Sequence, residues 1–460
     1  MERARVSRAK TGDLQQGKAP VPLLRFDPIW SRTESENKKI VDEIHEALLK
    51  TRCAIVLEGS GRHERPSTSS QPHQVLQEYR ETSMNLPSNP KNIRLEAPVR
   101  FSPSVERLGA DEAETTQALI ATMRYINERT FADAGRAIRS VHAKTHGILQ
   151  GHLDVDGDLP DELAQGLFAK PGHYPVVMRF STIPGDILDD SLSTPRGLAI
   201  KVIGVEGERL EGSEGDVTQD FLLINGPAFG APDPKTFLSV VRVLARTTNR
   251  AQRLKKILSA VMRQVQKAIV VVTGHPNTTV ATLGGQPETH ILGETFYSQA
   301  PLRFGDFIGK IAVAPKSPEL TDLAQAPLNV NGVPDGLRDA VLDFFGKNGG
   351  VWEVRAQLCT DLEHMPIENA AVVWSEEVSP YQRIARITVK PQLAWSEARS
   401  SVVDDGMSFV PWHGLAAQRP LGAIMRVREA VYEEAKKFRA QKNGRVIQEP
   451  HEVVPFEDPL

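Results

Sequence analysis

The sequence predicts an α+β protein that is built around an antiparallel β-sheet or barrel. The first observation is a group of short apolar runs in the middle of the chain, separated by Gly, Pro and Asp turns. Several of these runs alternate apolar and polar residues, as strands do. The second observation is that helical patterns flank this group on both sides. Strands clustered in the middle of a chain with helices around them are typical of the α+β class.

The apolar periodicity places the individual elements. Helical spacing predicts helices at 35–50, 110–130 and 237–272. The tail at 415–443 is also strongly helical and ends at Gly444, a common C-terminal stop. We expect strands at Gly147–Val155, Pro175–Phe180, Gly197–Val205, Asp220–Ile224, Gln299–Val313, Val351–Cys359 and Gln382–Val389.

The chain divides into an extension and one large domain. Residues 62–89 are rich in Ser, Pro, Gln, His and charge and poor in apolar side chains, which indicates a loop or a weakly ordered strap. We therefore expect residues 1–100 to form a partly irregular N-terminal extension or arm. Residues 101–460 carry the patterned elements and are expected to form the main domain.

Composition excludes several classes of function. A net charge of -3 and a pI of about 6.5 give no reason to expect nucleic acid as a partner. The two cysteines, Cys53 and Cys359, lie far apart and support neither a disulfide framework nor a cysteine metal site. No apolar run is long enough to span a membrane, and the N-terminus lacks the apolar stretch of a signal peptide. We therefore expect a cytoplasmic protein with no membrane span.

The first candidate for chemistry is His142, within the stretch Arg139-Ser-Val-His-Ala-Lys. From residue type and neighbours alone, a histidine satisfied in the core is the simpler interpretation. His146 and His152 follow nearby, so a metal site made of three histidines is an alternative. No carboxylate stands where a His-Glu-x-x-His helix needs one, which weakens that alternative.

Three further patterns follow along the chain. Arg179 lies in an apolar run. It is either a strand-end arginine that pairs with a surface group or an anion-binding residue whose guanidinium donates two hydrogen bonds to a carboxylate. The stretch Pro195-Arg-Gly-Leu-Ala-Ile-Lys201 is typical of a turn that leads into a strand. Arg428 and Tyr432 share a helix face, with Arg439 seven residues further on. An ordinary charged surface helix also explains this last pattern.

In this order and spacing, the four patterns resemble the motifs of the haem catalase superfamily. The stretch around His142 is similar to its distal-histidine motif. Arg179-Phe-Ser-Thr182 resembles its strand motif, with a propionate-binding arginine and a serine that orients the histidine. Pro195–Lys201 is similar to its Pro-Arg-Gly-Phe-Ala-Val-Lys stretch, and 428–439 matches the spacing of its proximal tyrosine helix. The resemblance covers roughly residues 136–439.

The resemblance implies a catalase-type antiparallel β-barrel with surrounding helices and a C-terminal helix that carries the haem ligand. The implied cofactor is ferric haem b, with Tyr432 as the iron ligand. A phenolate persists at neutral pH only beside a cation, and Arg428 stands one turn before the tyrosine. His142 would be the acid and base, with Ser181 orienting its ring. The other cofactor-binding residues implied are Arg139, Val141, Arg179, Leu223, Arg428 and Arg439.

One family feature is missing from the stretch that we match to it. Catalases carry a distal Asn within Asn-Thr-Pro, and the matching stretch here is 216–225. Two registers are open, which put either Thr218 or Val217 at the Asn position. In both, Thr218 or its neighbour Gln219 is the expected hydrogen-bond partner of a peroxide, and Thr218 is our candidate catalytic residue. At least one aromatic side chain expected over the haem face is replaced by Leu.

These features predict a haem-dependent, peroxide-metabolising oxidoreductase with a role in the oxidative stress response. We expect a catalase-related peroxidase of the short form, without the C-terminal flavodoxin-like domain, with possible catalase activity on hydrogen peroxide. One alternative is a fatty-acid hydroperoxide isomerase or lyase of the allene oxide synthase type, although that branch typically has Thr where this chain has Val141. Another is a catalytically weak haem-binding protein. The expected partner is a small-molecule peroxide, and a homo-oligomer held by residues 1–100 is possible by analogy.

Overall fold

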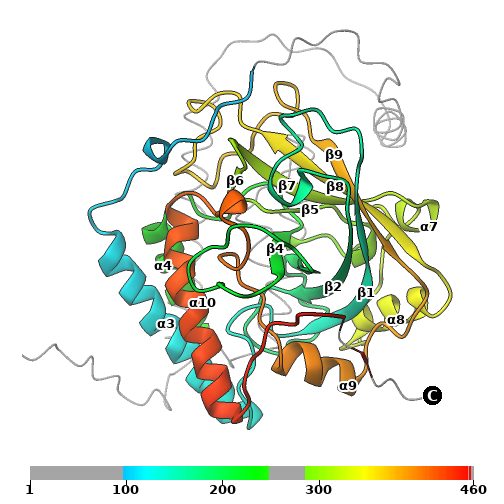
Figure 1. Cartoon of the computed structure of the whole chain (residues 1–460). Helices are drawn as coiled ribbons and strands as arrows, with labels where there is room; N and C mark the ends of the chain where they lie inside the picture. The colour runs from blue at the N-terminus through cyan, green and yellow to red at the C-terminus, as the bar shows by residue number, and fades with distance from the viewer. Residues whose placement is uncertain (1–96, 248–284, 454, 457–460) are drawn as a thin grey trace, which may run out of the picture. The chain divides into compact units, whose positions relative to one another are not determined.

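The computed structural model describes residues 97–247, 285–453 and 455–456 (Figure 1). The expected helix at 35–50, most of the extension at 1–100 and the second part of the expected helix at 237–272 lie outside these residues. The division into an extension and one domain stays a prediction. The helices are α3 (Glu112–Ala134), α4 (Pro234–Thr247), α7 (Pro318–Thr321), α8 (Gly336–Phe345), α9 (Glu397–Ser400) and α10 (Ala423–Asn443), and a π-helical turn spans Ser401–Asp405.

The strands form a closed antiparallel barrel. They lie in one nine-stranded sheet with the order β5-β4-β3-β2-β1-β9-β8-β7-β6, and a further pairing of β5 with β7 closes the ring and leaves β6 outside it. Every pairing between neighbouring strands is antiparallel. The strands are β1 (Thr145–Val155), β2 (His173–Thr182), β3 (Arg196–Ile203), β4 (Thr218–Ile224), β5 (Phe296–Tyr297), β6 (Leu302–Phe304), β7 (Phe307–Pro315), β8 (Gly350–Leu358) and β9 (Gln382–Val389).

The barrel encloses the main hydrophobic core. Phe180 of β2 lies at its centre, with its ring 5.8 Å from that of Phe296 and 6.2 Å from that of Trp352. Side chains alternate between the two faces of a strand, so every second residue of β2, β3 and β4 points into this core. The intervening residues point outward, where Val177, Ala199, Ile203 and Leu222 pack against the chain at 401–409. This outer face carries the candidate active site.

Three helices pack together on one side of the barrel. Figure 1 shows α3 and α10 running beside each other, and a shared apolar cluster includes residues of both helices and of α4. Long helices in a globular protein gain most of their stability from such an apolar face. The predicted fold class, α+β with an antiparallel barrel and a C-terminal helix, is confirmed. The cluster consists of Leu119, Met123, Ile126, Leu238, Val241, Ala245, Val427 and Val431, with Val141 packed against it.

Some expected boundaries differ from those observed. The strand expected at 299–313 is a hairpin of β6 and β7, because Gly305 has a φ of +62° and turns the chain with Asp306. The C-terminal helix begins at Ala423 rather than at 415, because Gly422 adopts a φ of +88°. Helix α8 was not expected from the sequence. No helix among the described residues is long and apolar enough to cross a membrane.

Candidate active site

His142 is held in a strained backbone conformation just before β1. Its φ is +55°, a region that residues with a side chain rarely adopt and that costs about 1–3 kcal/mol. Hydrogen bonds on both sides of the peptide hold it there. Its N–H donates to the Ile183 carbonyl at 2.8 Å, and its own carbonyl accepts from an Arg179 guanidinium nitrogen at 2.8 Å. Both partners belong to β2 or to the chain directly after it.

The barrel wall also orients the His142 ring. Its Nδ1 lies 3.0 Å from the Ser181 Oγ, within hydrogen-bond distance. On the neighbouring strand, Gly197 pairs with Ser181, and a Cβ at this glycine would lie only 2.5 Å from the ring Cε1. A side chain at Gly197 would therefore displace the ring. Because Nδ1 is occupied by Ser181, Nε2 is the nitrogen available to a ligand.

The surroundings keep the His142 imidazole neutral. Burial, together with the charges of Arg179, Arg428 and Arg139, lowers the pKa of His142 to about 3. The imidazole is therefore uncharged at neutral pH and able to accept a proton. Its folded-state pKa lies below the ordinary value of 6.5, so its contribution to stability is present above pH 6.5 and is lost as the pH falls toward 3.

Arg139, Arg179 and Arg439 form a buried arginine cluster next to His142. Arg139 donates to the Val403 carbonyl at 2.9 Å, and Arg139 and Arg439 both donate to the Met407 carbonyl, at 3.1 and 3.2 Å. Burial lowers the pKa of Arg139 well below its usual value, and the charges of Arg439 and Arg179 lower it further. The three guanidinium groups therefore repel one another and favour an anion between them.

Helix α10 presents a tyrosine that is bonded by an arginine. An Arg428 guanidinium nitrogen donates to the Tyr432 hydroxyl at 2.8 Å, and the guanidinium carbon lies 5.2 Å from the centre of the tyrosine ring. The charge of Arg428 also acts on His142. Val141, next to the histidine, packs against the apolar cluster that includes Val431 of α10. The tyrosine helix and the histidine therefore belong to one region of the molecule.

Leu223, expected to line the cofactor, points the other way. It lies in the barrel core, whereas its neighbour Leu222 packs on the outer face with Ala199 and Val403. The cause is the strict alternation of a strand, by which a shift of one residue moves a side chain to the opposite face. The apolar side chain on the outer face is that of Leu222.

Thr218 does not lie beside His142. It pairs with Ile203, six residues along β3 from Gly197, a separation of about 20 Å at the usual rise of a strand. Its Oγ1 lies 2.6 Å from the His413 Nε2, in a different buried cluster. Gln219 accepts a hydrogen bond from the Leu415 N–H at 2.7 Å. The structure therefore separates the expected peroxide-binding Thr218 from the histidine.

Asn225 occupies the end of the ladder that carries Gly197, and it was not among the residues predicted from the sequence. Its N–H donates to the Arg196 carbonyl at 3.0 Å, and its Oδ1 accepts from the Arg196 N–H at 2.8 Å. Its Nδ2 donates to the Glu294 carboxylate, and its other contact is with the Gln286 Oε1 at 3.5 Å, the limit of a hydrogen bond. One amide N–H is therefore weakly engaged.

No local signal in the sequence pointed to Asn225. It directly follows the strand that ends at Ile224, whereas the polar partner of a peroxide was expected before the apolar run of that strand.

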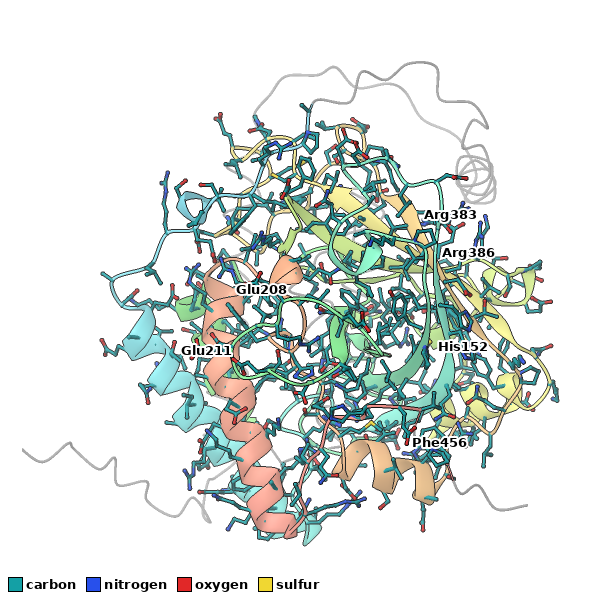
Figure 2. All side chains as sticks on the ribbon, viewed as in Figure 1. His152, Glu208, Glu211, Arg383, Arg386 and Phe456 are labelled. Atoms are coloured by element: carbon teal, nitrogen blue, oxygen red, sulfur yellow. The ribbon has the colours of Figure 1, made fainter. Side chains whose placement is uncertain are left out.

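The three histidines of the metal alternative do not come together. His146 is buried, whereas His152 is exposed on the same strand, six residues away (Figure 2). That spacing along a strand is about 20 Å. Among the described residues, no group of three or more His, Cys, Asp and Glu side chains could hold a metal ion.

Comparisons with known proteins found likenesses among solved structures alone. No protein-family model matches the chain, and no curated protein matches it. A fungal catalase, known from a 1.9 Å crystal structure, has 17% identity over 77% of this chain and 67% of its own, with a TM-score of 0.48. Catalase A of Saccharomyces cerevisiae has 17% identity over 77% of this chain and 70% of its own, also at 0.48. A bacterial catalase has 14% identity over 83% and 68%, with a TM-score of 0.45.

The histidines offer a direct test of this electrostatic description. We expect the His142 ring to stay neutral from pH 5 to pH 8, because burial and three arginines lower its pKa to about 3. His364 is the internal control, since it is exposed and its hydrogen bond to Asp361 raises its pKa. Nitrogen-15 NMR of the labelled histidines, assigned with His142→Gln, measures both. A His142 signal that titrates near pH 6.5 would show that the ring is not desolvated.

Proposed function

We propose that this chain binds haem b and metabolises peroxides as an oxidoreductase. The observation that carries the proposal is the charge balance of the arginine cluster. Three guanidinium groups lie around Asp404: those of Arg139 and Arg179 face its carboxylate, and that of Arg439 donates to its backbone carbonyl. The charge of the neighbouring Asp405 also acts on Arg139 and Arg439, but the exposed Arg136 pairs with Asp405 and balances that charge. The excess of two positive charges matches the two propionates of a haem.

Two further features fit a haem. The buried Nε of Arg139 has no hydrogen-bond partner in the described part of the chain, and its nearest carboxylate oxygen lies 3.9 Å away. An anion beside the cluster would satisfy it. The Tyr432 hydroxyl oxygen accepts a hydrogen bond from the Arg428 guanidinium, and a tyrosine oxygen is a known type of haem-iron ligand. Arg139, Arg179 and Arg439 would then hold the propionates, and Tyr432 the iron.

A bound haem would supply the electron-transfer chemistry at the peroxide. Reduction of one hydrogen peroxide consumes two electrons and two protons and yields two water molecules. The electrons come from a second peroxide, which leaves as oxygen, or from an organic donor. The protein moves the proton: the neutral His142 Nε2 accepts it from one peroxide oxygen and returns it to the leaving oxygen. Ser181 keeps the ring in place through Nδ1.

Asn225 is our candidate for the group that orients the peroxide, in place of Thr218. It stands at the same end of the β3–β4 ladder as Gly197, against which the His142 ring rests. Its amide can donate one hydrogen bond to a peroxide oxygen. Thr218 is engaged with His413 at the opposite end.

A second candidate function is rearrangement of a lipid hydroperoxide at the same haem. The observation that favours it is the apolar character of the outer barrel face near the arginine cluster, where Ala199 and Leu222 pack. Such a face suits an alkyl chain better than hydrogen peroxide. Comparing the turnover of hydrogen peroxide with that of a fatty-acid hydroperoxide separates the two functions.

Tyr432→Phe tests the iron ligand. The haem-loaded protein should show a Soret band with the features of tyrosinate ligation, and Tyr432→Phe should lose these features because it lacks the ligand oxygen. The matched control is Tyr125→Phe. Tyr125 also accepts a hydrogen bond from an arginine one turn away, Arg129 at 3.3 Å, but on the outside of α3. Equal spectra of the two variants would contradict the ligand assignment.

His142→Gln tests the proton transfer. Glutamine retains hydrogen-bonding capacity but cannot carry a proton, so we expect peroxide turnover to fall about 10²–10⁴-fold while haem remains bound. Oxygen release and peroxide consumption measure this loss. The exposed His364 supplies the control variant, His364→Gln, which should leave turnover unchanged. Full turnover in His142→Gln would exclude the histidine from catalysis.

Asn225→Ala and Thr218→Val discriminate between the two candidates for peroxide orientation. We expect Asn225→Ala to lower turnover about tenfold, the loss of about 1.4 kcal/mol of transition-state stabilisation. Thr218→Val should lower stability, because Thr218 bonds His413 in a buried cluster, without changing turnover per haem. Turnover per bound haem, measured beside the melting temperature, separates these effects. The opposite ranking would restore Thr218 to the site.

A further inference from the structure

The turn at 401–409 has an unusual backbone. Helix α9 continues into the π-helical turn Ser401–Asp405, which ends at Gly406. A π-helical turn lacks the regular hydrogen-bond ladder of an α-helix and recurs at functional sites. Here the carbonyls of Val403, Asp404 and Met407 accept hydrogen bonds from the arginine cluster. The turn therefore binds the arginine cluster through backbone carbonyls and, in addition, through the side chain of Asp404.

That side chain is Asp404, whose carboxylate has a complete set of donors. The Arg179 Nε donates to Oδ1 at 2.6 Å, the Thr145 hydroxyl lies 2.8 Å from the same oxygen, and the Ser400 hydroxyl donates to Oδ2 at 2.7 Å. Burial opposes ionisation, but the charges of Arg179 and Arg139 outweigh it and lower the pKa of Asp404. The carboxylate is therefore ionised and fixed in place.

Asp404 in turn determines where Arg179 points. The Arg179 side chain is 3% exposed, so its charge needs a partner within the protein. With Nε bound to Asp404, its terminal NH2 donates to the His142 carbonyl at 2.8 Å and to the Ala143 carbonyl at 3.3 Å. His142 is the residue with the strained positive φ. The chain of contacts thus runs from the turn, through one arginine, to the backbone of the histidine.

The C-terminal segment holds the turn from its other side. The Arg445 guanidinium donates to the Ser401 hydroxyl at 2.9 Å, and the Ser408 hydroxyl donates to Glu449 at 2.5 Å. Figure 2 shows Phe456 beside α9, where the guanidinium carbon of Arg399 lies 4.5 Å from the centre of its ring. The arginine cluster holds the turn on one side and the C-terminal segment holds it on the other. A turn that is to keep His142 in one position has to be held firmly in this way.

We propose that Asp404 is a positioning residue for His142, acting through Arg179. It keeps the guanidinium on the His142 carbonyl and thereby holds the strained backbone that aims the ring at Ser181. The backbone part of this proposal does not depend on any cofactor. Its consequence for catalysis rests on the proposed peroxide reaction.

The neighbouring aspartate provides a matched control. Asp405 pairs with Arg136 at 3.3 Å, and the Arg136 side chain is 55% exposed, so this aspartate faces the surface rather than Arg179. Asp404→Asn and Asp405→Asn each remove one negative charge from adjacent positions in the same turn. Asp404→Glu keeps the charge and serves as the conservative variant.

The first measurement is the His142 ring signal in nitrogen-15 NMR of the full-length chain before haem is added. We expect Asp404→Asn to broaden this signal and to abolish the preference for one ring tautomer that the Ser181 hydrogen bond imposes. Asp404→Glu should restore part of it, and Asp405→Asn should match the wild type. An unchanged His142 signal in Asp404→Asn, with only a lower melting temperature, would reduce Asp404 to a structural role and overturn the proposal.

The second measurement is steady-state kinetics of the haem-loaded variants. We expect kcat for peroxide to fall roughly ten- to hundredfold in Asp404→Asn, with KM little changed, because the proton acceptor is misplaced. If no variant binds haem, the wild type included, the proposed function fails while the NMR result still decides the positioning role. If Asp404→Asn does not fold, Ser400→Ala and Thr145→Val each remove one anchor of the carboxylate. A His142 signal unchanged in both would equally overturn the proposal.

Discussion

The ion pair between Arg179 and Asp404 joins the barrel wall to the turn at 401–409. Both groups are buried, and a charge in the protein interior is tolerated only with a hydrogen-bonded partner. The Arg179 Nε is held by Asp404, and its terminal NH2 group therefore donates to the His142 and Ala143 carbonyls, just before β1. Strand β2 and the His142 backbone are thereby fixed to Asp404 in the turn at 401–409, which lies 225 residues from Arg179 in sequence.

The same burial explains the electrostatics of the site. Burial, helped by the charges of Arg179, Arg428 and Arg139, keeps the His142 imidazole neutral. Next to it, the three guanidinium groups of the arginine cluster with one carboxylate between them leave room for two more negative charges. A neutral base beside an anion-binding cluster is chemically useful, because it accepts a proton without competing for the anion. On the other side, Arg428 supplies a cation to the Tyr432 hydroxyl. Each feature alone is common in proteins, and their combination in one region supports the peroxide chemistry proposed above.

Strand β3 serves two sites with a single outer face. Gly197 leaves space for the His142 ring at one end, and Lys201 bonds Asp220 at 2.6 Å, and also Glu449, near the other end. Lys201 is fully buried, and burial raises the pKa of Asp220 to about 7 against the opposing pull of the lysine. The run from Pro195 to Lys201 therefore contacts the His142 ring at Gly197 and holds a buried ion pair at Lys201, four residues further along the same face. The Lys201 end anchors the segment that holds the turn at 401–409.

The sequence by itself determined the fold class, the strand pattern and the residue types of the site. Apolar periodicity is local, so it predicted the strands from β1 to β4. Of the expected site residues, Arg179 contacts the His142 backbone, and Tyr432 contacts Arg428, whose charge acts on His142. Only the tertiary structure decided which side chains of β4 face the histidine, since alternation turns a one-residue change of register into a change of face. This is why Leu222, rather than Leu223, packs on the outer face. Thr218 shares that face but lies at the far end of the strand, and Asn225 follows the strand at the end where the His142 ring rests. Asp404 could not be found from sequence at all, because its role depends on a contact with Arg179 across 225 residues. The position of Asp404 depends on the burial of an ion pair between distant parts of the chain, and local sequence patterns do not encode such a contact.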